Sequence, residues 1–152
     1  MANKVMGQNV CLFVSSGSTS GTTAQVLALA TSCKISITLA TINTANKDDG
    51  DFESVLPTRF SWTIDGDGFY SVDADAARFT FDELMAMYLA KTPIGVAIGS
   101  TTGVMPQVVG TGKVLSGQAY ITKLDIDAKD ANAVTYTISL QGTGALAYGV
   151  VA

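Results

Sequence analysis

Apolar and polar residues alternate in several short stretches of the chain. In residues 33–39 the apolar members fall on one side of an extended chain, and the alternation recurs in residues 59–65 and 134–141. A period of two is typical of a β-strand with one buried face. Apolar runs bounded by turn-forming residues predict further strands at residues 8–14, 25–30, 94–99, 108–115 and 118–126.

One segment follows a different period. Its apolar residues repeat at the spacing of a single helical stripe and are Phe81, Leu84, Met85, Tyr88 and Leu89. Thr80 and Glu83 have the spacing of a capping box at the start of this helix. Pro93 predicts its end. No second helix is visible, so the stripe is expected to pack on a sheet.

These elements predict a mainly β fold. About eight strands and one helix fit an antiparallel β-sandwich or small barrel with one flanking α-helix. The 152 residues suit one domain with one core. We expect this domain to span residues 1–152, with an N-terminal arm at 1–7, an extended loop at 43–57 and a C-terminal arm at 145–152.

The charged residues add modest information about the surface of this domain. Charged residues are 14 % of the chain, which favours a surface that is partly covered by neighbouring subunits. The net charge is −4, and the nine basic residues form no cluster, so tight nucleic-acid binding is not expected. An acidic surface can still face DNA, because like charges prevent sticking.

The sequence offers little chemistry. It has no histidine, the commonest general base and metal ligand, and we predict no catalytic, cofactor-binding or metal-binding residues. Cys11 and Cys33 each lie in an apolar strand and are interpreted as buried free thiols, with a disulfide between them as the alternative. The Asp65–Gly68 run lacks the ligand spacing of a calcium loop, and the Gly-Thr-Gly triplets at 110–112 and 142–144 are interpreted as bulges or turns.

Several segments resemble, in order, the major tail protein (tail tube protein) family of long-tailed bacteriophages. They are MANKVMGQNVCLFV and TSCKISITLAT in the first part, SWTIDGDGFYSVD and TFDELMAMYLAKTPIGVAIG in the middle, and GQAYITKLDIDAKDANAVTYTISLQGTGAL at 117–146. The resemblance implies the tail-tube fold and a structural protein without enzymatic activity or cofactor. It implies hexameric rings, stacked into a tube around a channel for genome passage.

The family's partners and location follow from the same resemblance. They are other copies of the chain, the tape measure, tail terminator and baseplate proteins, and DNA only transiently in the channel. The chain would reside in the virion tail after assembly in the host cytoplasm, without membrane insertion. The absence of a signal pattern at the start and of any apolar run near twenty residues agrees with this expectation.

The resemblance also directs attention to two sets of residues. The loop expected to contact the next ring contains Asn43, Asn46, Lys47, Asp48, Asp49, Gly50, Asp51, Phe52 and Glu53. The small polar residues expected as candidates for the channel wall are Lys34, Ser36, Thr38, Thr135, Thr137 and Ser139. Which strand faces the channel stays open at this point, because each set also suits a solvent-exposed outer face.

Two other functions remain as alternatives. One is the tube protein of a contractile tail or bacterial secretion machine, which a surrounding sheath would distinguish. The other is a β-sandwich module for carbohydrate binding or adhesion, which would need exposed aromatic residues or a calcium site. Trp62 is the only tryptophan, and its place in the alternation predicts that it lies in the core.

Overall fold

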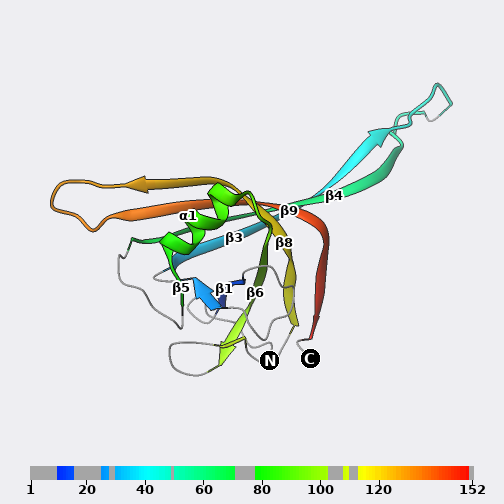
Figure 1. Ribbon diagram of the computed structural model, residues 1–152. Coiled ribbons are helices and arrows are strands. Elements are labelled where there is room, and N and C mark those ends of the chain that lie inside the picture. The colour runs from blue at the N-terminus through cyan, green and yellow to red at the C-terminus, as the bar shows by residue number, and fades with distance from the viewer. Residues whose placement is uncertain are drawn as a thin grey trace, which may run out of the picture.

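The computed structural model describes residues 10–15, 25–27, 30–48, 50–70, 78–102, 108–109 and 113–150. Within these ranges lie nine β-strands and one α-helix (Figure 1). The strands are β1 (Val10–Ser15), β2 (Gln25–Leu27), β3 (Ala30–Asn43), β4 (Val55–Phe69), β5 (Arg78–Phe79), β6 (Ile94–Thr102), β7 (Val108–Val109), β8 (Lys113–Asp127) and β9 (Thr135–Val150). The helix α1 (Phe81–Ala90) follows β5. The expected N-terminal arm and the triplet at 110–112 fall outside the described residues.

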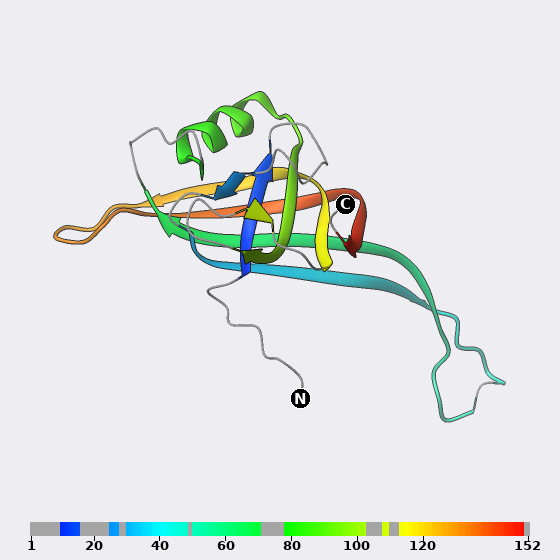
Figure 2. The same ribbon diagram turned by 90° about the horizontal axis from the view of Figure 1, so that it is seen from below.

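The strands pair in the order β3-β4-β9-β8-β6-β1-β2-β5, and β7 pairs with β6. Figure 2 shows β1 and β6 crossing the long strands β3 and β4 steeply, so that the two parts of the sheet face one another. The prediction of a mainly β sandwich or barrel with one flanking helix is confirmed. Among the described pairings, β2 with β5 is the one parallel pair, which the sequence did not predict.

The core lies between these two parts of the sheet, and the helix closes it. Its buried residues come from β1, β4, α1, β6, β8 and β9, and they are Leu12, Val14, Trp62, Ile64, Phe81, Leu84, Ile94, Val96, Ala119, Ile121, Tyr136, Ile138 and Leu140. Burial of this much apolar surface is the main term that stabilises the sandwich. Trp62 belongs to the core, as its alternation predicted.

The helix begins and ends as the sequence predicts. The Glu83 carboxylate accepts hydrogen bonds from the Thr80 backbone N–H at 2.8 Å and from the Thr80 hydroxyl at 3.2 Å, which satisfies a donor before the first turn. Lys91 adopts a left-handed conformation at the end, with φ of 55°. Phe81 anchors the first turn, because its ring packs edge-on against Tyr70, with 5.1 Å between the ring centroids.

Residues 113–127 form one strand, although the sequence predicted two strands separated near Gly117. This glycine lies inside β8, where the register with β9 shifts between Ser116 and Gln118. A Cβ at Gly117 would lie 2.8 Å from the Cζ2 atom of Trp62. The glycine therefore makes room for a core ring and does not end the strand.

Two hairpins project from opposite ends of the molecule (Figure 1). One consists of the ends of β3 and β4 with the connection 44–54, and the other joins β8 to β9. The extended loop expected at 43–57 is therefore shorter, since Asn43 and residues 55–57 belong to the strands. The expected C-terminal arm is part of β9 as far as Val150, where it pairs with β8.

Candidate functional site: a polar sheet face and a projecting arm

The four long strands β3, β4, β9 and β8 carry polar side chains on the face opposite the core. Residues paired across neighbouring strands share a face, and the register aligns Lys34 with Asp65, Asp65 with Ser139, and Ser139 with Lys123. We call this surface the polar face. It comprises Ser32, Lys34, Ser36, Thr38, Ser61, Thr63, Asp65, Asp67, Thr135, Thr137, Ser139, Gln141, Tyr120, Lys123, Asp125 and Asp127.

Hydrogen bonds between side chains connect the strands across the polar face. The Asp67 carboxylate accepts from the Thr137 hydroxyl at 2.9 Å through one oxygen and from the Ser32 hydroxyl at 3.1 Å through the other. Asp65 accepts from the Ser139 hydroxyl at 2.8 Å. Because these groups are exposed to water, each bond adds little to stability, and its main effect is to hold the side chains against the sheet.

The net charge of the polar face is weakly negative. It carries two lysines against four aspartates, which leaves a charge of −2. Lys123 forms an ion pair with Asp125 at 3.0 Å, and Lys129, just beyond the face, forms one with Asp127 at 3.2 Å. The face therefore presents hydroxyl groups and scattered charges of both signs, without a concentration of positive charge that would bind phosphate tightly.

Both sets of channel-wall candidates lie on this one surface. Lys34, Ser36 and Thr38 come from β3, and Thr135, Thr137 and Ser139 come from β9, with β4 between them. The sequence could show that each strand has a polar side. It could not show that the two polar sides coincide, because the pairing of both strands with β4 decides this.

The hairpin that contains the loop expected to contact the next ring extends beyond the body of the sheet. We call residues 37–60 the arm, and Figure 1 shows it reaching well past the rest of the fold. At its outer part the Thr44 N–H donates to the Ser54 carbonyl at 2.9 Å. The Asn43 and Asn46 side chains accept from the backbone N–H groups two residues on, each at 2.7 Å, which shapes the loop through local turns.

The structure places the expected contact residues at the exposed tip of the arm. Asn43, Asn46, Lys47, Asp48, Gly50, Asp51, Phe52 and Glu53 are all exposed, whereas Asp49 lies outside the described residues. Gly50 has a φ of 71°, a conformation that favours glycine. Phe52 is 85 % exposed, so packing against the described residues does not account for an aromatic residue at the tip.

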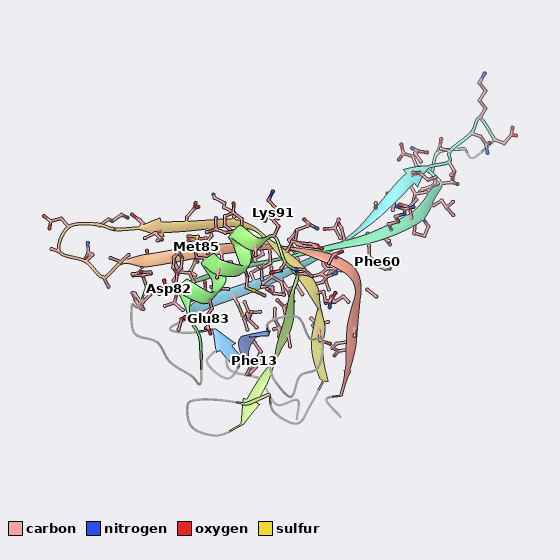
Figure 3. The ribbon with its side chains drawn as sticks, viewed as in Figure 1. Phe13, Phe60, Asp82, Glu83, Met85 and Lys91 are labelled. Carbon is pink, nitrogen blue, oxygen red and sulfur yellow. The ribbon has the colours of Figure 1, made fainter. Side chains whose placement is uncertain are left out.

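Sequence reasoning missed the apolar residues along the shaft of the arm. Ile37, Leu39, Ile42, Val55, Leu56 and Phe60 are large and exposed. Figure 3 shows Phe60 where the arm leaves the body of the sheet. A cluster of exposed apolar side chains on one projecting element is typical of a protein-binding surface. The apolar alternation of 33–39 could have revealed these residues, because it continues toward a predicted loop, where no core would bury apolar side chains.

The structure offers no support for other chemistry in the residues that it describes. No group of three or more acidic or cysteine residues in these ranges is arranged to hold a metal ion. Asp65 and Asp67 lie in the middle of β4 and not in a loop. Trp62, at 3 % exposure, is unavailable as a platform for a sugar. None of the described segments forms a helix with the length and apolar content of a membrane span.

Comparisons with known proteins agree with this geometry. A family model described as phage tail tube protein matches residues 4–148. No curated protein sequence is significantly similar to the chain. The solved structures with a similar fold include the tail of an empty gene transfer agent particle with C6 symmetry, at 16 % identity and a TM-score of 0.74, covering 96 % of this chain and 99 % of that one.

Two further solved structures share the fold. The tail tube of SPP1 matches with a TM-score of 0.72 at 14 % identity, and the match covers 97 % of this chain and 80 % of the other. A chain in the baseplate of the anti-feeding prophage matches with a TM-score of 0.68 at 10 % identity, covering 99 % of both chains. At these identities the similarity establishes the fold.

Proposed function

Because the chain belongs to the phage tail tube protein family, we propose that it is a structural subunit of a bacteriophage tail tube. Its copies form hexameric rings that stack around a channel for genome passage. The observation that carries this proposal is the polar face, a single continuous surface of hydroxyl groups and scattered charges on four long strands. Such a surface suits a wall along which a polyanion slides without binding.

The polar face is the wall of the channel in this proposal. Its charge of −2 repels DNA phosphates weakly, and its hydroxyl groups keep the wall hydrated. We assign Lys34, Ser36, Thr38, Thr135, Thr137 and Ser139 to this wall. Contact with DNA is transient, because the face has no cluster of basic residues that would release many counterions on binding.

Ring closure would use the free edge of the sheet. In the described topology β3 is the last strand on one side, and it exposes the backbone groups of a 14-residue strand. An open edge of this length tends to pair with another chain. A head-to-tail contact through such an edge closes into a ring when the rotation between neighbouring copies is a whole fraction of a turn. Such a ring would leave the β3 edge paired, which supports lateral pairing of subunits through β3.

Stacking of rings would use the arm. It projects beyond the sheet, and its tip residues from Asn43 to Glu53 are available to a neighbouring ring. The exposed apolar residues along its shaft give this contact more binding energy than the charged tip alone, since exposed ion pairs contribute little.

The remaining parts of the proposal follow from the same role. The chain acts without enzymatic activity, it resides in the virion tail after assembly in the host cytoplasm, and no part of it enters a membrane. Its partners are other copies of the chain and the tape measure, tail terminator and baseplate proteins at the ends of the tube.

A second candidate is the tube protein of a contractile tail or injection machine. It is favoured by the similarity to a chain of the anti-feeding prophage baseplate, which covers 99 % of both chains. The two candidates predict the same subunit fold and the same ring. They differ in whether a sheath surrounds the tube in the intact particle.

Electron microscopy of the concentrated, purified protein tests the proposal. We expect rings with sixfold symmetry and, at higher concentration, tubes with a central channel. Monomers at every concentration, together with the absence of the chain from isolated tails, would overturn it. A sheath around the tube in isolated particles would favour the second candidate.

A further inference from the structure

The polar face ends in exposed apolar side chains at both of its extremities. Strand β4 runs from the arm to the base of the β8–β9 hairpin, which projects further (Figure 1). At the arm, Leu56 is 54 % exposed and pairs with Ile42, which is 51 % exposed. At the opposite end, Phe69 is 44 % exposed and pairs with Thr135.

A β-bulge in β4 places Leu56 beside Ile42 on the polar side of the arm. The register between β3 and β4 shifts between Leu39 and Thr41, so that Thr58 and its neighbour Arg59 together oppose the single residue Ala40. The Thr58 hydroxyl donates to the Ala40 carbonyl at 2.9 Å and holds the extra residue in place. Without the bulge, Leu56 would share the side of Phe60, because residues four apart in a regular strand point the same way.

Phe69 reaches the same face from the other end of β4. Its neighbour Gly68 points to the core, where a Cβ would lie 2.7 Å from the Tyr136 ring, so Phe69 must point to the opposite side. Its cross-strand neighbours are Thr135 and then Asp127, whose carboxylate is paired with Lys129 at 3.2 Å. The partial neutralisation of Asp127 makes this end more suitable for an apolar partner.

We propose that Ile42 and Leu56 of one copy pack against Phe69 of the next copy along the tube. This contact seals the joint between the polar face of one ring and that of the following ring. The inference rests on the proposed function, which makes a second copy of the chain the occupant of both apolar ends.

Charge and symmetry specify the direction of the contact. The arm tip carries one lysine against four acidic residues, so two arm tips would repel each other. The two apolar ends are different surfaces of the molecule, and joining unlike surfaces produces a stack that can continue without limit. The contact is therefore head-to-tail, with the arm of each ring on the Phe69 end of the next.

The length of β4 also sets an upper limit on the distance between successive rings of the tube. Phe69 lies thirteen residues after Leu56, and at the usual rise of a strand this is about 43 Å. With the width of the touching side chains added, the distance between successive rings cannot exceed roughly 50 Å. A tilt of the strands relative to the tube axis would shorten it.

Cross-linking of paired cysteines tests the contact directly. In a chain with Cys11→Ser and Cys33→Ser, the substitutions Leu56→Cys and Phe69→Cys are made singly and together, and tubes are treated with a short bis-maleimide. We expect the doubly substituted chain to give a ladder of covalent multimers and an equal mixture of the single variants to give dimers. The matched control, Leu89→Cys with Phe69→Cys, should give no ladder, although Leu89 is 73 % exposed.

Serine variants provide an independent measurement in the natural cysteine background. Ile42→Ser with Leu56→Ser, and Phe69→Ser alone, should abolish tubes at the concentration where the unaltered chain forms them, while Leu89→Ser retains them. Tubes of normal length from both variants, or no ladder from Leu56→Cys with Phe69→Cys, would overturn the proposed joint. Failure of the unaltered chain to form rings or tubes would instead overturn the proposed function.

Discussion

Trp62 packs directly against the backbone of Gly142. A Cβ added at Gly142 would lie 2.1 Å from the Cδ2 and Cε2 atoms of the indole ring. The indole N–H donates to the Gly144 carbonyl at 3.4 Å, and the Gln141 side-chain amide donates to the Trp62 carbonyl at 3.3 Å. The ring therefore fixes β9 where its register with β8 shifts, which is also where the strand leaves the polar face.

Gly142→Ala should destabilise the fold by about 1–3 kcal/mol, because the new methyl group overlaps a buried ring that would have to shift. Gly66→Ala is the matched control, since a Cβ there would meet its nearest atoms at 3.4 Å. Denaturant unfolding followed by tryptophan fluorescence measures both variants. Equal stability of the two would show that the ring can be displaced without cost.

Glu83→Ala should lower stability by about 1 kcal/mol, because it removes the acceptor for the Thr80 N–H and hydroxyl at the start of α1. Asp82→Ala is the control, as Asp82 is acidic and in the same first turn, and its loss should cost only a few tenths of a kcal/mol. Thermal unfolding should rank the variants in this order. The reverse order would contradict the role of the capping box.

Cys33 is a free thiol whose pKa is raised above its ordinary value of 9.0 by burial. Burial favours the neutral thiol and raises its pKa in the folded chain. The stability that depends on the neutral thiol is therefore fully present below the pKa of the thiol in the unfolded chain, and it is lost as pH rises through the pKa of the thiol in the folded chain. With Cys11 replaced by serine, the reaction of Cys33 with a disulfide reagent should reach half its maximal rate above pH 9. The same pH profile in folded and urea-unfolded protein would contradict this expectation.

Excision of the arm tip should block stacking and leave the fold intact. Thr44 and Ser54 are hydrogen-bonded neighbours, so residues 45–53 can be replaced by Asn-Gly, which closes a two-residue hairpin. The control replaces the same residues with a Gly/Ser segment of the original length. We expect rings without tubes from the excised chain and an unchanged unfolding midpoint. Tubes of normal length would refute the assignment of the tip to ring contacts.

The sequence predicted best what local interactions determine. The stripe and the capping box located the start of α1, and Pro93 lies three residues after its last residue, because each of these signals acts over a few positions. The prediction of a break between strands near Gly117 was wrong. This position is a glycine because the Trp62 ring of β4 leaves no room for a Cβ. That reason is visible only after the strands have paired.

In the candidate site, too, the sequence predicted the local features and missed those that depend on strand pairing. Alternation identified the polar sides of β3 and β9, but the register with β4 was needed to place them on one face. The apolar pair of Ile42 and Leu56 could not be predicted, because it depends on the bulge opposite Ala40. A one-residue change of register reverses which face each later side chain occupies.

A density map of the assembled tube tests the central claim most directly, through the identity of the face that lines the channel. The proposal predicts sixfold rings with the polar face inward, so that Asp65, Thr137 and Ser139 border the channel and α1 lies on the outside. A tube with α1 toward the channel, or with the polar face buried between subunits, would contradict it.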